Sequence, residues 1–353
     1  MTLKPGIDFH CIFMRMLKIR SLFFILCLSL AALSASSQDA KQLQETANTF
    51  MRQGDYSNAI LILNRASQMD PKDLGIAKDL GLNYYFSRDY NKALDIYKVL
   101  LERDDADDQC FQVAGDIYQA LEQPKEREKV YKKGIKKFPD SGPLYNELGE
   151  LLWSQKDFGA IKYWEKGIEM DPGFAKNYYN ACMHYYFSTD KVWSLLYGEI
   201  FLNIDPQNPL CAEVKNTLLE GYKKLFADAS LQKSVTDKSP FVAAYLETMN
   251  KQTGIAAMGI STESLTMIRT RFILEWYPVY AKQFPFKLFE LQQQLLQEGM
   301  FDAYNQWIFT AAQDLPGYQN WTNLHASEYN DLVRFRSGRT FRIPAGQYYR
   351  QPN

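Results

Sequence analysis

The chain repeats itself with a period of 33 or 34 residues between residues 40 and 206. Five consecutive segments share one order of residues: a small residue, a large apolar residue three positions later, a polar break, and a second apolar stripe. The small residues are Ala47, Gly81, Gly115, Gly149 and Cys182. A period of this length indicates one supersecondary unit repeated along the chain, in which each unit buries its apolar face against its neighbours.

Each unit is predicted to form two helices joined by a tight turn. The small residue lets the two helices approach, and a large side chain about sixteen positions later is expected to fill the space beside it. These side chains are Leu63, Tyr97, Tyr131 and, after a one-residue deletion, Trp164. The predicted turns are Gly54-Asp55-Tyr56, Arg88-Asp89-Tyr90 and Lys156-Asp157-Phe158. Prolines close four of the units, because proline cannot continue the hydrogen-bond ladder of a helix.

This pattern resembles the tetratricopeptide repeat, a helix–turn–helix unit of 34 residues. The resemblance implies an all-α fold, with a solenoid of about five units over residues 40–206 and an α-helical C-terminal region over residues 207–353. Arrays of this kind are binding scaffolds with many different partners. The resemblance therefore predicts a protein-interaction scaffold but does not name its partner.

Residues 1–37 have the composition of a secretory signal peptide. Lys18 and Arg20 precede the apolar run Ser21–Leu33, and small residues follow it. We expect cleavage before Gln38 and export to the periplasm or the exterior, compatible with peripheral association with the envelope. No transmembrane span is then expected, since the apolar run is short. An uncut membrane anchor is the alternative.

Neither charge nor motifs predict an enzyme or a nucleic-acid-binding protein. Removal of the leader, with its four basic residues and one acidic residue, leaves a net charge of about −4, which argues against nucleic-acid binding. Cys110, Cys182 and Cys211 lack the spacing of a zinc site and are expected to be free and buried. We therefore predict no catalytic residue, no metal and no cofactor. An enzyme with its site in residues 207–353 is a less favoured alternative.

The resemblance also implies which residues face a partner, because the first helix of each unit lines the concave surface in this family. The predicted partner-binding residues are Lys78, Tyr85, Phe86, Trp153, Lys176, Tyr179, Tyr186 and Phe187. Aromatic side chains often carry the binding energy of protein interfaces. We expect a partner peptide or helix in this groove. Alternatively, the aromatics stack on an envelope carbohydrate or polymer, or pack against the protein's own C-terminal region.

The region after residue 206 loses the period. In the fifth unit Ser194 and Gly198 replace the usual alanine and aromatic, which indicates a modified contact between this unit and the C-terminal region. Residues 211–229 are predicted to form a helix that caps the array. The last twenty residues interleave arginines with aromatics. This tail is either a strip for an anionic partner or an extended segment docked on the acidic body.

Overall fold

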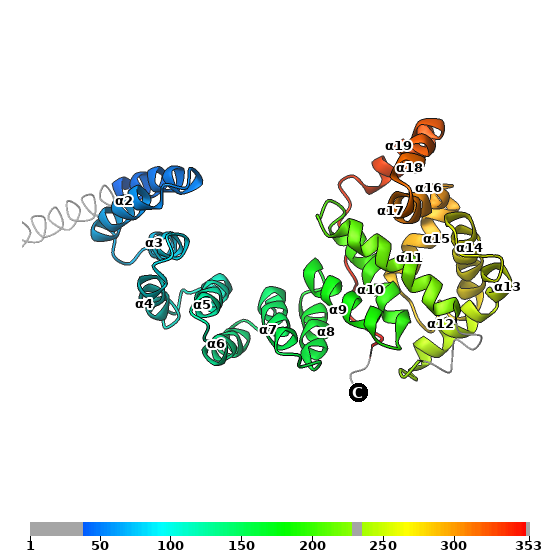
Figure 1. Cartoon of the computed structure of the whole chain (residues 1–353), viewed down its shortest axis with the longest axis horizontal. Coiled ribbons are helices and arrows are strands. Elements are labelled where there is room, and N and C mark those ends of the chain that lie inside the picture. The colour runs from blue at the N-terminus through cyan, green and yellow to red at the C-terminus, as the bar shows by residue number, and fades with distance from the viewer. Residues whose placement is uncertain (1–37, 228–234, 351–353) are drawn as a thin grey trace, which may run out of the picture. The chain divides into compact units, whose positions relative to one another are not determined.

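The computed structural model describes residues 38–227 and 235–350, and over these residues the chain is helical and contains no strand (Figure 1). The all-α prediction is confirmed. The predicted leader, residues 1–37, lies outside the described residues. The chain divides into two compact units, residues 1–130 and 131–353. This division falls within the third predicted repeat, and the limits predicted at residues 40, 206 and 207 stay predictions.

The first unit is a series of helix pairs. A helix over residues 38–52 is followed by α2 (Tyr56–Met69), α3 (Leu74–Phe86), α4 (Tyr90–Leu100) and α5 (Asp108–Ala120). The division of the chain falls within the next helix, α6 (Pro124–Lys137). A core of small and aliphatic side chains, including Ala47, Ala59 and Leu63, holds the first pairs together.

The second unit continues the helix pairs and then departs from them. It contains α7 (Gly142–Ser154), α8 (Ala160–Met170), α9 (Ala175–Phe187), α10 (Lys191–Ile204), α11 (Cys211–Ala227), α12 (Pro240–Asn250), α13 (Thr253–Ala256), α14 (Thr262–Val279), α15 (Lys287–Gln297), α16 (Phe301–Asn305), the π-helical turn η1 (Gln306–Thr310), α17 (Ala311–Gln313), α18 (Leu315–Leu324) and α19 (Ala326–Arg336). One continuous core runs from Ala160 to Ile343. The last repeats and the C-terminal helices therefore share a hydrophobic interior.

The turns within the repeats have the conformation that their sequence requires. Gly54, Arg88 and Lys156 lie at positive φ, at 77°, 65° and 62°. The aspartate that follows Gly54 or Arg88 caps the next helix: Asp55 accepts from a backbone amide of α2, and Asp89 from one of α4. The three predicted turns are thus confirmed, with the left-handed residue at the same place in each.

The small residue of each repeat sets how closely its helices approach. A Cβ atom on Gly81 would lie 2.6 Å from the Tyr97 ring, and one on Gly149 would lie 2.3 Å from the Trp164 indole. Both glycines are on the first helix of their repeat, and both rings are on the second helix of the same repeat. The predicted pairing of a small residue with a large side chain sixteen or fifteen positions later is confirmed at these two sites.

The packing of helix α10 explains why the fifth repeat departs from the sequence pattern of the others. Eleven of its residues, Val192 through Leu202, are buried, so the helix is covered on all sides. A Cβ atom on Gly198 would lie 2.9 Å from the Cys182 sulfur of α9 and 3.0 Å from Leu218 of α11. A larger residue at this position would push α11 away. The modified contact that the sequence indicates is therefore a tight crossing of α10 and α11.

A buried polar network joins α10 to the C-terminal helices. Glu199 on α10 pairs with Arg269 on α14, and both side chains are almost fully buried. The same carboxylate accepts from Gln292 Nε2 at 2.8 Å and from the Tyr304 hydroxyl at 3.0 Å. Asn305 accepts from the other end of the guanidinium. Four elements, α10, α14, α15 and α16, are thus tied to a single carboxylate.

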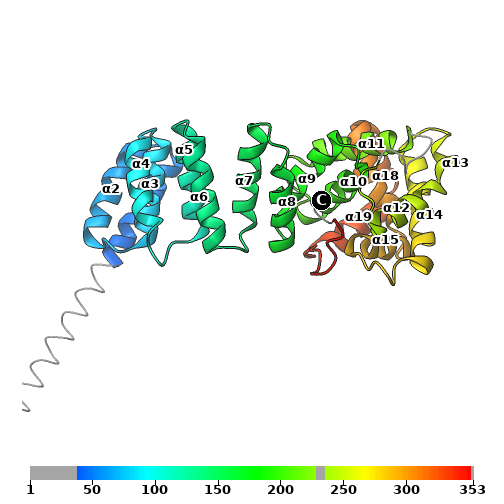
Figure 2. The ribbon, with the colours of Figure 1, turned by 90° about the horizontal axis from the view of Figure 1, so that it is seen from below.

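The C-terminal tail is docked on the body, alongside α9 and α10 (Figures 1 and 2). The Tyr349 ring stacks on Phe241 at 4.5 Å, and its hydroxyl donates to the Pro285 carbonyl at 2.6 Å. Arg350 Nε donates to the Tyr185 hydroxyl at 2.8 Å, and Arg350 Nη1 to Asp237 at 3.4 Å. For this end of the chain, the docked alternative is the one the structure shows.

Candidate functional site

Three of the predicted partner-binding residues, Lys78, Tyr85 and Phe86, belong to the first compact unit and lie on α3. Lys78 Nζ forms an ion pair with Asp107 at 2.5 Å. Tyr85 is half-buried beside Phe86 and Tyr90, whereas Phe86 is 42% exposed. Burial raises the pKa of Tyr85. The apolar side chains are thus available, while the lysine is engaged by the next repeat.

In the second compact unit, residues 131–353, side chains of neighbouring repeats contact Trp153 and Lys176. The Trp153 indole packs against Phe158 and Trp164 of its own repeat and His184 of the next, at centroid distances of 5.5 to 5.8 Å. Lys176 Nζ forms an ion pair with Glu150 at 2.8 Å. Trp153 is therefore as much a packing residue as a surface residue.

Helix α9 continues the same pattern onto α11. The Tyr179 hydroxyl donates to Glu213 at 2.9 Å, and the Thr217 hydroxyl donates to the Met183 sulfur at 3.7 Å. Both pairs are separated by 34 residues, the same separation as in the bond between Asn180 and Asn146 at 2.8 Å. Helix α11 therefore occupies the place of the first helix of a sixth repeat.

The end of α9 carries an aromatic and cationic patch, which we call the α9 patch: Tyr186, Phe187, Lys191 and Lys224. Phe187 is 71% exposed and contacts the Tyr186 ring edge-on at 5.2 Å. Lys224 Nζ lies 3.7 Å from the centroid of the Tyr186 ring, and Lys191 Nζ lies 5.8 Å from it. Among the described residues, no carboxylate forms an ion pair with either lysine.

Of the eight predicted residues, the structure thus brings Tyr186 and Phe187 together with two lysines that the prediction did not include. Lys78, Lys176 and Tyr179 instead bond to acidic residues, each on a neighbouring repeat or at its start. Tyr179 and Tyr186 also contact α11, as the self-packing alternative expects. The 34-residue offset was the signal that could have placed Glu213 beside Tyr179, whereas Lys224 lies 38 residues after Tyr186. Binding of a partner by these residues stays a prediction.

The half-buried histidine and the buried cysteines of the repeats are uncharged side chains that pack against their neighbours. Burial, together with the nearby Arg350, lowers the pKa of His184, so its imidazole is neutral at pH 7. Burial raises the pKa of Cys110 and of Cys182 to about 12, so both are protonated thiols. Over residues 38–227 and 235–350, His, Cys, Asp and Glu side chains form no cluster of three or more that could hold a metal ion. None of the helices in those segments combines the length and apolar character that a membrane span needs.

Part of the chain is similar in sequence to known proteins. The family model of the tetratricopeptide repeat matches residues 50–117. Residues 50–117 are therefore tetratricopeptide repeats. A stretch of 126 residues is similar to BBSome complex member BBS4 of Bos taurus, with 30% identity, covering 34% of this chain and 23% of that protein. The protein of Mus musculus with the same name is 28% identical over 126 residues. The chain spans about a quarter of the length of these curated relatives.

Solved structures of other proteins resemble this chain at low sequence identity. The pilF protein of Pseudomonas aeruginosa is 16% identical with a TM-score of 0.46, covering 57% of this chain and 90% of its own. YrrB, described as a tetratricopeptide-repeat protein with an unusual peptide-binding site, is 20% identical with a TM-score of 0.36, covering 51% of this chain and 95% of its own. Repeats of this family are scaffolds for protein interaction in many different proteins.

Proposed function

We propose that this protein is a non-enzymatic scaffold of the cell envelope, and that it binds a peptide or helix of a partner protein on the concave faces of its repeats. The repeats support the protein-binding part of the proposal. The composition of residues 1–37 supports the export part, with the mature chain in the periplasm or outside the cell.

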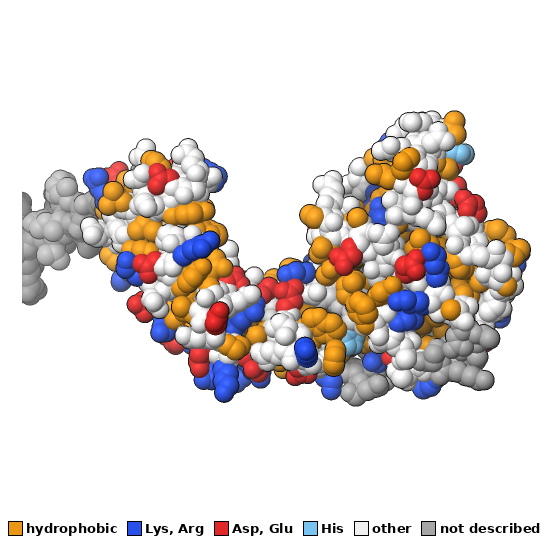
Figure 3. Space-filling model, in the orientation of Figure 1, with side chains coloured by type: hydrophobic (Ala, Val, Ile, Leu, Met, Phe, Trp, Pro, Cys, Tyr) orange, Lys and Arg blue, Asp and Glu red, His pale blue; other side chains and the backbone are white. Residues whose placement is uncertain are grey.

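The observation that carries the proposal is the α9 patch. Phe187 is 71% exposed at the end of a helix whose other aromatic side chains are buried or half-buried. Lys224, without a carboxylate partner among the described residues, gives the patch a positive rim, whereas Lys191 Nζ donates to the Tyr186 and Ser188 carbonyls. The complementary ligand is a peptide with an apolar side chain followed or preceded by acidic residues. On the face of the second unit in Figure 3, hydrophobic side chains are likewise interspersed with charged ones.

The test compares three baits: residues 38–353, the Tyr186→Ala/Phe187→Ala variant, and a Leu274→Ala control. Leu274 is a 61% exposed apolar residue on α14, away from the repeats. Each bait is incubated with envelope extract of the host, and captured proteins are identified and then purified for calorimetry. We expect the double variant to bind the purified partner at least roughly tenfold more weakly than the control does. Equal affinity for all three baits contradicts the assignment of the patch.

The carbohydrate alternative makes a different forecast in the same experiment. A soluble envelope glycan would shift the tryptophan fluorescence of the control, and no protein would be retained. The export part is tested separately by fractionating the host and sequencing the N-terminus of the purified chain. A mature chain that begins at Gln38 in the exported fraction is the expected result, and an unprocessed chain in the cytosol would refute it.

A further inference from the structure

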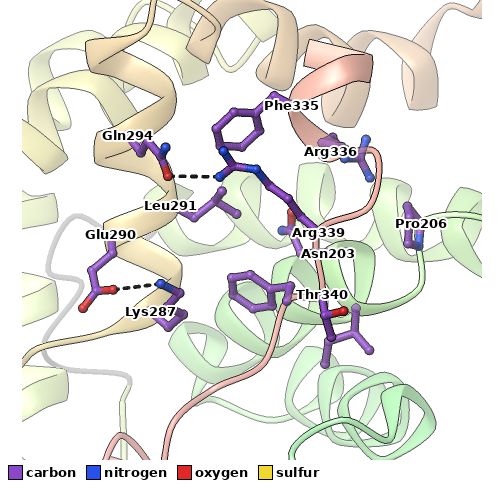
Figure 4. Close-up of a pocket in the computed structure, with 12 residues that line it drawn as sticks. Asn203, Pro206, Lys287, Glu290, Leu291, Gln294, Phe335, Arg336, Arg339 and Thr340 are labelled. Carbon is purple, nitrogen blue, oxygen red and sulfur yellow. Dashed lines mark hydrogen bonds and ion pairs between the residues drawn. The ribbon is translucent and has the colours of Figure 1, made fainter. Parts of the chain in front are cut away.

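A cavity of about 420 Å³ lies in the second unit, between the end of the last repeat and the C-terminal helices (Figure 4). The end of α10, one face of α15, the end of α19 and the start of the tail enclose it. Its volume is in the range of small-molecule sites, roughly 300 to 1,000 Å³. The residues that form it lie far apart in the sequence, between 203 and 341, so no local motif indicates it.

The walls of the cavity are partly apolar. Leu291 comes from α15, Phe335 from α19, and Phe341 from the tail. Ile204 and Pro206 close the side formed by the end of α10. A ligand that fills this space would bury an apolar body of modest size.

The charged groups of the cavity are mainly basic. Lys287 and Glu290 neutralise each other at 3.2 Å. Arg336 lies with its guanidinium 3.6 Å from the centroid of the Trp307 ring, and its Nη2 atom is buried without a hydrogen-bond partner among the described residues. Arg339 lies over the Phe335 ring at 3.8 Å and donates to Gln294 Oε1 at 3.4 Å. Figure 4 shows Arg339 reaching from the tail toward α15.

Neither guanidinium has a carboxylate partner among the described residues. A third cation lies close by, since Lys215 Nζ is 4.2 Å from the centroid of the same Trp307 ring. Burial lowers the pKa of Lys215 to about 8, and Arg336 contributes to the lowering. The local excess of positive charge is thus held in place without a counter-ion from the described chain. Arginine forks in such fixed positions are suited to carboxylates and phosphates.

We propose that this cavity binds a small organic anion with an apolar body, whose acidic group is held by Arg336 and Arg339 and whose apolar part lies between Leu291, Phe335 and Phe341. The site is independent of the α9 patch. It would make the scaffold responsive to a metabolite or to the end of an amphiphile.

The first experiment measures which chemistry the cavity accepts. Calorimetry on residues 38–353 uses 4-phenylbutyrate and 4-phenylbutyl phosphate as anionic probes and 4-phenylbutan-1-ol, which has the same apolar body, as the neutral match. We expect at least one anion to bind at least roughly tenfold more tightly than the alcohol, and the ratio of the two anions tells a carboxylate site from a phosphate site. No binding of either anion at low-millimolar concentration overturns the proposal, as does equal binding of the alcohol.

The second experiment places the anion. Arg339→Gln removes an exposed cavity arginine, so the fold is expected to persist, and Arg334→Gln is the matched control. Arg334 lies on α19, outside the cavity, and pairs with Asp331. Arg339→Gln should weaken anion binding roughly tenfold and Arg334→Gln should not change it. Leu291→Trp, which fills the cavity, should abolish binding. Unchanged binding in Arg339→Gln and Leu291→Trp places the ligand elsewhere and refutes the site.

Discussion

The pair of Arg269 and Glu199 is the most consequential single contact in the second unit. Both side chains are almost fully buried, so removing one leaves the other charge without a partner in the core. Arg269→Met is therefore expected to lower the free energy of unfolding of this unit by about 3–5 kcal/mol. Urea titration followed by tryptophan fluorescence measures it. Arg271→Met, on the exposed side of the same helix, is the control and should change little.

A double variant separates the cost of the orphaned charge from the value of the pair. Glu199→Leu/Arg269→Met removes both charges and is expected to recover much of the loss, because apolar replacements of a buried ion pair are often tolerated. A single Arg269→Met variant as stable as the control would show that water reaches this network.

Lys215 is expected to make the free energy of unfolding depend on pH. Its pKa is about 8 in the folded chain, below the ordinary value of 10.5, so the unfolded chain holds the proton more tightly. Stability from this group therefore rises as pH increases from about 8 to about 10, and its penalty is fully present below 8. Lys215→Met should be more stable than wild type at pH 7 by on the order of 1–2 kcal/mol, with the gap closing by about pH 10. Thermal unfolding of both proteins at the two pH values tests this. A constant gap would contradict the assignment.

At the scale of elements, the repeat is tested by its glycine. Replacing a helical glycine by alanine normally stabilises a helix by about 0.5–1 kcal/mol. At Gly149 the new methyl would meet the Trp164 indole, so the sign should reverse and Gly149→Ala should lose about 1–3 kcal/mol. Gly254→Ala, where nothing lies within 4 Å, is the matched control. Denaturant midpoints for the two variants that move in the same direction would contradict the close packing.

The sequence predicted the repeat elements because their determinants are local. Gly149 and Trp164, or Arg88 and Asp89, are near each other in the chain and recur with the period. Helix α11 was predicted only as a cap, because Asn216 stands 34 residues after Cys182, where the other repeats have a small residue. Its place in the array became visible from contacts such as that between Tyr179 and Glu213.

The candidate site was less predictable for the same reason. Sequence placed Tyr186 and Phe187 on a concave face, but it could not show that Lys78 and Lys176 would be neutralised by acidic partners. The cavity of Arg336 and Arg339 depends on how the tail returns to α15. Contacts between segments this far apart leave no periodic trace in the sequence.

At the scale of the whole second unit, Arg350 ties the end of the chain to the repeats. It contacts Tyr185 on α9, Glu165 on α8 and Asp237 in the segment before α12. Burial raises the pKa of Glu165, against the lowering effect of its hydrogen bond from Tyr185 and of Arg350. Without the arginine, two buried carboxylates would face each other with no cation between them.

Arg350→Ala should therefore lower the free energy of unfolding by about 2–4 kcal/mol at neutral pH. The loss should be larger at pH 8 than at pH 5, because protonation of Glu165 relieves the repulsion and its folded pKa, already raised, would rise further. Arg342→Ala, at an exposed arginine of the same tail, is the control. Urea unfolding of both variants at the two pH values decides the matter. Equal, pH-independent effects would mean that the tail is held by its tyrosines alone, with Tyr349 on Phe241 as the main contact. A loss confined to Arg350→Ala and growing with pH would make the tail a clamp that fixes the last repeats to the C-terminal helices.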